Sequence, residues 1–234
     1  MKGKLYLIPT LLGNASPEDV LPGMVFKIIN RLHHYIVEDV RSARRFLKKA
    51  GSPVEIDDIE FYELNKYTTE SDMEGFLSAA LSGYDTGLLS EAGSPCVADP
   101  GSIITANAHK RGIQVIPLSG PSSIMLALMA SGLNGQAFAF HGYLPVKRND
   151  RARAIKKIEK DSLQNKHSQI FMETPYRNMQ LLETLTAVCH PASRLCIACD
   201  ITLKTEFILT LTVSEWKKNK PDINKRPAIF ILQG

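Results

Sequence analysis

The sequence of 234 residues lacks several features that would assign it to a common protein class. No apolar run approaches the roughly 20 residues that cross a bilayer, and the apolar stretch after Lys4 is far shorter than the core of a secretory signal. There is no G-x-G-x-x-G after the first predicted strand and no G-x-x-x-x-G-K-[ST], so a dinucleotide fold and a P-loop nucleotidase lose their usual support. These absences predict a globular cytoplasmic protein with no membrane partner.

Cysteine is scarce, and its four positions do not suggest a shared site. Cys196 and Cys199 have C-x-x-C spacing, but they lie in a strand-like run, where alternation sends the two side chains to opposite faces. No histidine and cysteine spacing resembles a zinc site. The adjacent His33 and His34 would point apart in a strand. We therefore expect buried free thiols and no metal ion.

A repeating order of strand, loop and helix fills the first half of the chain, residues 1–118. This order predicts a mainly parallel sheet covered on both faces. Within it, Ser71 and Asp72 are expected to cap a helix over 72–82.

The second half, residues 119–234, begins with a helix over 124–130 that is apolar nearly all round and so predicts a buried position. Its last three strands follow one another with no clear helix between them, which favours a mixed sheet. The polar segment 216–225 reads as an exposed loop.

Small-residue loops follow four of the predicted strands, at 9–14, 91–101, 119–123 and 173–177. The carboxyl ends of parallel strands meet at one edge of a sheet, where α/β proteins bind ligands close to the backbone. We expect these loops to gather into a ligand cleft, although turn residues of this kind also occur in ordinary connections.

The net charge of +4 says little about partners, but the basic residues are concentrated in two segments. The first is 41–49 and the second is 147–160. Such clusters can follow the phosphates of a nucleic acid. Solvated helix faces have the same appearance in a sequence, so this alternative stays open.

Six motifs occur in an order that can be compared with known families. They are L-Y-L-I-P-T-L-L-G-N at 5–14, E-D-V-R at 38–41, E-A-G-S-P with D-P-G at 91–101, P-L-S-G-P-S at 117–122, G-Y-L-P-V-K at 142–147 and E-T-P-Y-R at 173–177. Together they resemble the tetrapyrrole methylase superfamily, and most closely its ribosomal RNA small subunit methyltransferase I branch.

The resemblance implies an α/β fold with two lobes, a mainly parallel N-terminal sheet and a mixed C-terminal sheet. It implies a homodimeric methyltransferase that binds S-adenosyl-L-methionine between the lobes and methylates a ribose 2′-hydroxyl of ribosomal RNA in the small ribosomal subunit. Carried over motif by motif, the cofactor would contact Pro9, Glu91, Ala92, Gly93, Ser119, Gly120, Pro121, Ser122, Ser123, Met172, Glu173 and Thr174.

The resemblance also implies which residues face the acceptor. These are the catalytic candidates Glu38, Asp39 and Arg41, with Lys147 near the mouth of the cleft. The two basic segments add Arg44, Arg45 and Arg148 to Lys147 as RNA-binding candidates. A ribose hydroxyl needs a base within hydrogen-bond reach, so Glu38 or Asp39 is the first candidate and Glu91 the second. The same acids could instead simply favour a helix N-terminus.

Departures from the family pattern leave the acceptor open. The usual C-E-D-T-R is Val37-Glu-Asp-Val-Arg41 here, and the usual D-A-G-T-P is Glu91-Ala-Gly-Ser-Pro95. Two alternatives therefore remain: methylation of a tetrapyrrole or another small metabolite, and a cofactor-binding RNA-assembly factor with little turnover.

Overall fold

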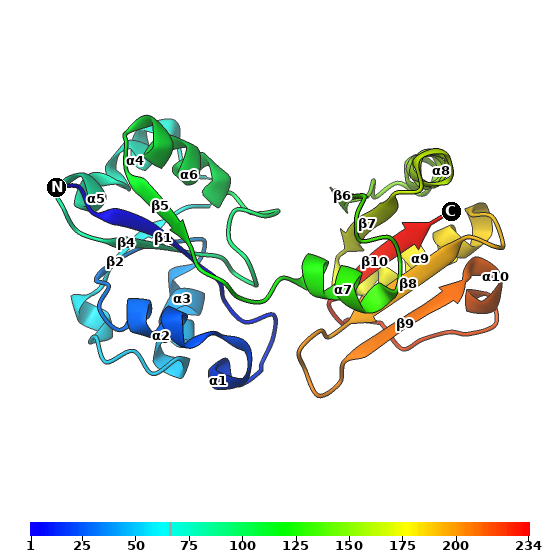
Figure 1. Cartoon of the computed structure of the whole chain (residues 1–234), viewed down its shortest axis with the longest axis horizontal. Helices are drawn as coiled ribbons and strands as arrows, with labels where there is room; N and C mark the ends of the chain where they lie inside the picture. The colour runs from blue at the N-terminus through cyan, green and yellow to red at the C-terminus, as the bar shows by residue number, and fades with distance from the viewer. Residues whose placement is uncertain (66) are drawn as a thin grey trace. The chain divides into compact units, whose positions relative to one another are not determined.

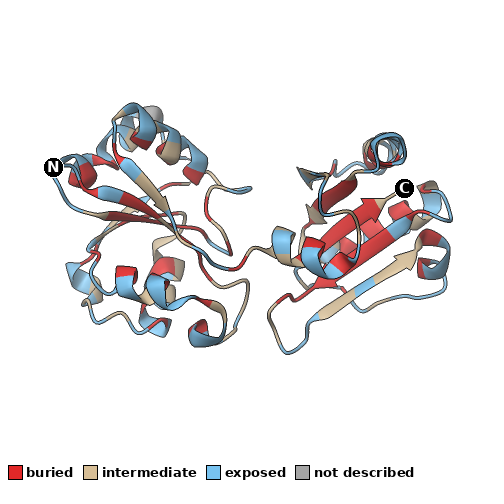
Figure 2. Ribbon diagram, viewed as in Figure 1, coloured by how far each residue is buried: buried red, intermediate tan, exposed pale blue. Residues whose placement is uncertain are grey.

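The computed structural model describes residues 1–65 and 67–234 (Figure 1). The chain divides into two compact units, Met1–Ser122 and Ser123–Gly234. The boundary expected from the sequence, after residue 118, lies in the same connection between the fifth strand and the next helix. Buried residues concentrate in the strands of each unit (Figure 2).

A parallel five-stranded sheet in the order β3-β2-β4-β1-β5 organises the first unit, as predicted. Its strands are β1 (Lys4–Ile8), β2 (His34–Val37), β3 (Glu60–Glu63), β4 (Thr86–Leu89) and β5 (Gln114–Pro117). Its helices are α1 (Pro17–Val20), α2 (Gly23–Ile29), α3 (Val40–Lys49), the 3-10 turn η1 (Ile56–Asp58), α4 (Glu70–Gly75), α5 (Ser78–Leu81) and α6 (Gly101–Lys110).

Both faces of this sheet are covered, because successive strand residues point to opposite sides. Tyr6 and Ile8 of β1 belong to a core with α2 and α3, whereas Leu5 belongs to a core with α4, α5 and α6. Figure 1 shows these two groups of helices on opposite sides of the sheet. The predicted double covering of the first sheet is confirmed.

The second unit contains a mixed five-stranded sheet in the order β6-β7-β10-β8-β9, again as predicted. Only β6 and β7 run parallel among its hydrogen-bonded pairs. Its strands are β6 (Phe138–Tyr143), β7 (Ser168–Glu173), β8 (Arg194–Cys199), β9 (Phe207–Thr212) and β10 (Ala228–Gln233). Its helices are α7 (Ser123–Ser131), α8 (Arg148–Asn165), the 3-10 turn η2 (Pro175–Arg177), α9 (Asn178–Val188) and α10 (Val213–Trp216).

Two expectations about local structure need correction. The helix expected at 72–82 is two short helices, and its N-cap is Thr69, which forms a capping box with Asp72. The segment 216–225 is not wholly exposed: Trp216 and Ile223 are buried, and Trp216 Nε1 donates to the Leu195 carbonyl at 2.8 Å. The contact between Trp216 and Leu195 joins residues that are distant in sequence, so no local sequence pattern predicts it.

Helix α7 also differs from its prediction, because it buries only one stripe. Ala127 and Leu128 are buried, and α7 contacts β8, β9 and β10, but Met129 is 75% exposed. An all-apolar helix can pack against the core with a single face, and its composition does not show whether its other faces are buried or exposed. Along the described parts of the chain, no helix combines the length and apolar character that spanning a membrane requires.

Candidate functional site

Two loops at the carboxyl edge of the first sheet are hydrogen-bonded to each other. The Thr10 backbone N–H, after β1, donates to the Gly93 carbonyl at 2.9 Å, and the Thr10 hydroxyl donates to the Ser90 carbonyl at 3.1 Å. The Ser90 hydroxyl donates to the Gly93 carbonyl at 2.7 Å. Because β1 and β4 are neighbours, the loops that the sequence placed in one cleft do meet in this unit.

A third loop, 119–122 after β5, packs against the other two through glycine. A Cβ on Gly120 would lie 2.2 Å from Pro9 Cγ, and a Cβ on Gly93 would lie 2.9 Å from Leu12 Cδ2. Gly93 also has a φ of +74°, which disfavours other residues. The Ser94 hydroxyl donates to the Pro121 carbonyl at 3.2 Å. Close backbone approach therefore fixes the relative positions of the three loops.

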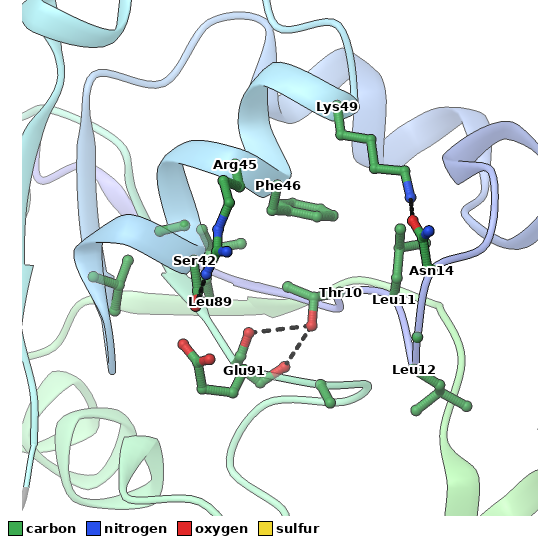
Figure 3. Close-up of a pocket in the computed structure, with 15 residues that line it drawn as sticks. Thr10, Leu11, Leu12, Asn14, Ser42, Arg45, Phe46, Lys49, Leu89 and Glu91 are labelled. Carbon is green, nitrogen blue, oxygen red and sulfur yellow. Dashed lines mark hydrogen bonds between the residues drawn. The ribbon is translucent and has the colours of Figure 1, made fainter. Parts of the chain in front are cut away.

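A cavity of about 510 Å³ opens beside these loops and under α3 (Figure 3). Such a volume suits a small ligand or one nucleotide. Its walls come from the β1 loop, α3 and the β4 loop, and its lining residues are Thr10, Leu11, Leu12, Gly13, Asn14, Val37, Ser42, Ala43, Arg45, Phe46, Lys49, Leu89, Ser90, Glu91 and Ala92.

Cations of α3 form one wall of this cavity. Arg45 and Lys49 are four residues apart and so lie on one helix face. In Figure 3 both extend from α3, while Glu91 lies on the β4 loop across the cavity. Lys49 Nζ donates to Asn14 Oδ1 at 2.6 Å. Arg41 precedes Arg45 by four residues, and so continues the same row of charge beyond the cavity lining.

Arg44 has a different environment from Arg45. Its guanidinium lies 5.6 Å from the centroid of the Phe61 ring, within the range of a cation–π contact. The structure therefore places Arg45 at the cavity and Arg44 over β3. Lys49 belongs to the first basic segment but was not predicted as a cavity residue, although its i, i+4 spacing from Arg45 was a usable signal.

Three carboxylates gather at the ends of β2 and β4. Burial raises the pKa of Glu38, and the nearby carboxylates of Asp99 and Glu91 raise it further, while the Glu91 backbone N–H donates to Glu38 and opposes them. Glu38 and Asp99 line one narrow crevice together with Leu88. Glu38 is thus a carboxylate whose surroundings favour taking up a proton.

Asp99 has one satisfied oxygen and one unsatisfied oxygen. Oδ1 accepts from the backbone N–H groups of Gly101 at 2.7 Å and Cys96 at 3.0 Å. Oδ2 is buried and has no hydrogen-bond partner among residues 1–65 and 67–234. Burial also raises the pKa of Asp99. Asp99 therefore shapes its turn and, in addition, adds negative charge beside Glu38.

Asp39 has the structural role that the sequence left open as an alternative, at the N-terminus of a helix. It is the N-cap of α3, and its Oδ1 accepts from the Ser42 backbone N–H at 2.7 Å. That hydrogen bond lowers the pKa of Asp39. Because its carboxylate is already engaged in the cap, Asp39 is a weaker candidate base than Glu38.

Several predicted site residues belong to the second unit. Ser123 begins α7, Met172 and Glu173 end β7, and Lys147 and Arg148 stand at the exposed start of α8. Glu173 is buried, and its Oε1 accepts from the Arg177 guanidinium at 2.6 Å and from the Thr174 backbone N–H at 2.7 Å. Its Oε2 has no partner among the described residues.

Arg151 belongs to the second basic segment but is not available to bind phosphates. It is only 3% exposed, and its guanidinium donates to the Thr184 hydroxyl at 3.0 Å and to the carbonyls of Val146 and Gln180. It therefore ties the end of the 142–147 motif to α9 rather than facing solvent. No group of three or more potential metal-binding side chains occurs within the described ranges.

Comparison with known proteins gives consistent matches. A family profile described as Tetrapyrrole (Corrin/Porphyrin) Methylases matches residues 27–217. A relative from Escherichia coli O157:H7, named Ribosomal RNA small subunit methyltransferase I, is 28% identical over 100% of this chain and 78% of its own length. The relative of the same name from Bacillus subtilis (strain 168) is 30% identical over 91% of this chain and 68% of its own.

Solved structures share the fold at lower identity. The methyltransferase CobJ has a TM-score of 0.66 at 15% identity, covering 99% of this chain and 94% of that protein. Uroporphyrin-III C-methyl transferase from Thermus thermophilus, solved with S-adenyl homocysteine, has a TM-score of 0.56 at 19% identity, covering 99% and 97%. These likenesses confirm the fold class expected from the sequence.

Proposed function

Because this chain belongs to the tetrapyrrole (corrin/porphyrin) methylase family, we propose that it is an S-adenosylmethionine-dependent methyltransferase acting on ribosomal RNA of the small subunit. The observation that carries this proposal is the alignment of nearly the whole chain with relatives named for that activity in several bacteria. The acceptor atom in the proposal is a ribose 2′-hydroxyl.

The loops of the first unit fit an extended, nucleoside-containing cofactor. Gly93 and Gly120 bring three loop backbones together where side chains would not fit, and such edges bind nucleotide-like ligands through backbone groups. We assign cofactor contact to 91–93 and 119–122 on this basis, and to 172–174 by motif. When bound, S-adenosylmethionine supplies a methyl group on a positively charged sulfur, and a neutral thioether leaves.

Glu38 is the proposed general base. Its carboxylate takes the proton of the attacking hydroxyl as the oxygen–carbon bond to the methyl group forms and the sulfur–carbon bond breaks. A base works best when its pKa lies close to the working pH, and burial with two neighbouring carboxylates moves the pKa of Glu38 in that direction. Positioning of the hydroxyl supplies the remaining catalysis, since the leaving group needs no protonation.

The row of cations along α3 is the proposed holder of the acceptor strand. Arg45 and Lys49 face the cavity, and Arg41 continues the row toward Glu38. Phosphate contacts of this kind position a nucleic acid without reading its sequence. Carboxylates of a tetrapyrrole would also pair with these cations, so it is the relatives named for ribosomal RNA methylation that favour RNA over the tetrapyrrole alternative.

Transfer of labelled methyl groups tests the proposal directly. The purified chain is incubated with labelled S-adenosylmethionine and small ribosomal subunits from a strain that lacks the corresponding methylation, and the labelled nucleotide is then mapped. We expect label on one ribose. Label on small metabolites alone, or RNA binding without any transfer, would overturn the proposal in favour of one of the two alternatives.

We further propose that the protein acts as a cytoplasmic homodimer. Met125 and Met129 are four residues apart on α7 and are 45% and 75% exposed, so this helix presents an apolar face. A second copy of the chain would cover it. Light scattering of the purified protein should give the mass of two chains, and Met129→Glu should shift it toward one.

A further inference from the structure

Two exposed tyrosines follow or end neighbouring strands of the second sheet. Tyr143 ends β6 and is 58% exposed, and Tyr176 lies in η2, just after β7, and is 74% exposed. β6 and β7 are parallel neighbours in which Tyr143 aligns with Met172, so both tyrosines leave the same edge of the sheet. Large exposed aromatic side chains on one edge indicate a binding surface.

The turn that carries Tyr176 is held rigidly. The buried carboxylate of Glu173 accepts hydrogen bonds from Thr174 N–H and from Arg177 Nε and Nη2, at 2.7, 3.0 and 2.6 Å. Burial opposes ionisation of Glu173, but Arg177 and Thr174 outweigh it and lower the pKa of Glu173. Tyr176 is therefore presented on a fixed backbone, which reduces the entropy lost when a ligand binds.

An exposed lysine is held next to this turn. The Lys225 backbone N–H donates to the Pro175 carbonyl at 3.0 Å, and the buried Asn178 amide holds the same segment by donating to the Arg226 carbonyl at 2.7 Å. Lys225 is itself exposed. The pKa of Arg177 is raised first by its hydrogen bond to Glu173 and also by the Tyr143 phenol, so Tyr143 lies within electrostatic reach of Arg177.

We propose that Tyr143 and Tyr176 stack on unpaired nucleobases of single-stranded RNA, while Arg177 and Lys225 face the adjoining phosphates. The inference rests on the proposed function and adds to it an RNA contact on the second unit. Aromatic rings interleaved with cations are the usual means of holding single strands, because every base has a stacking face and every linkage a charge.

The test uses the full chain and a fluorescein-labelled single-stranded RNA of twelve nucleotides, with binding followed by anisotropy. Tyr143→Leu and Tyr176→Leu should each weaken binding roughly 5- to 150-fold, the effect of losing one stacked base, while Tyr143→Phe and Tyr176→Phe keep wild-type affinity. Tyr84→Leu, at a tyrosine that is 62% exposed on the first unit, is the matched control.

The salt dependence separates stacking from charge. Lys225→Gln should reduce the slope of log affinity against log salt by about 0.7, the value for one phosphate on a single strand, while the leucine variants leave the slope unchanged. Unchanged affinity in both leucine variants would overturn the inference, as would a changed oligomeric state with unchanged affinity. If the wild-type chain methylates no RNA at all, the proposed function fails instead.

Discussion

Replacing Gly120 by alanine tests whether the contact between the β1 and β5 loops positions the site. The new Cβ would lie 2.2 Å from Pro9 Cγ and 2.5 Å from Pro9 Cβ. Carbon atoms in contact normally lie about 3.5–4.0 Å apart, so the two loops must separate by roughly 1 Å or more. The proline ring cannot turn aside as a flexible side chain would.

The expected effects follow from that displacement. Overpacking of this kind costs about 1–3 kcal/mol, which corresponds to a fall in the Tm of the first unit by roughly 3–15 °C. A misplacement of about 1 Å in a positioned site costs about 100-fold in rate. We therefore expect a comparable loss in the kcat/KM of methyl transfer for Gly120→Ala.

Two measurements make this prediction specific. Gly23→Ala in α2 is the control, because a Cβ there meets nothing within 4 Å. It should keep full activity and Tm. Trp216 is the only tryptophan and is buried in the second unit, so its fluorescence reports whether that unit stays folded. Full activity and an unchanged Tm in Gly120→Ala would refute the proposed arrangement of the loops.

Four other predictions concern the carboxylates and the second unit. Glu38→Gln should slow single-turnover methyl transfer by roughly 100- to 10,000-fold, and an active variant would exclude Glu38 as the base. The same variant should raise the Tm at neutral pH, because the pKa of Glu38 is raised in the folded protein and the ionised group opposes folding above that pKa. Asp39→Ala should keep transfer but lower the Tm at neutral pH, and this difference should vanish as the pH falls through the lowered pKa of Asp39. Asp99→Asn removes a like charge, so the acid limb of the kcat profile should move to lower pH, and an unmoved limb would show that Asp99 does not act on Glu38. Trp216→Phe leaves the Leu195 carbonyl without its buried donor and should cost about 1–3 kcal/mol in denaturant unfolding, with no change in RNA affinity.

The architecture was predictable because hydrophobic patterning acts over short distances. β-branched and apolar runs marked most strands, and the alternation of strand and helix predicted a parallel first sheet, which the structure confirms. Expectations were wrong where a distant contact decided the outcome. Trp216 packs in the core of the second unit, and the carbonyl of Leu195, 21 residues earlier, accepts its N–H there.

The candidate site was predictable to a smaller extent. The loops predicted from their glycine and proline residues do contact each other, because two backbones can come this close only where a residue has no bulky side chain. Side-chain roles could not be separated in this way. Glu38 and Asp39 are adjacent and chemically alike in the sequence, yet one lies by Asp99 and the other caps a helix. Arg151 reads as one of many cations, yet it is buried against Thr184.

The direction of each pKa shift distinguishes acids that stabilise the fold from the proposed base. Asp39 and Asp72 each accept a hydrogen bond from a backbone N–H at a helix start, and that contact lowers the pKa of each. The pKa of Glu215 is lowered first by the Thr212 hydroxyl and then by the Thr212 backbone N–H. Their ionised forms favour folding above the pKa of the unfolded chain.

Glu38 behaves in the opposite sense. Its pKa is raised, so its contribution to stability is present below the pKa of the unfolded chain and is lost as the pH rises through the folded value. At neutral pH an ionised Glu38 beside Asp99 and Glu91 weakens the fold that contains it. A carboxylate in such a place is not explained by stability, whereas uptake of a proton from an acceptor hydroxyl relieves the repulsion and gives the group a chemical reason to be there.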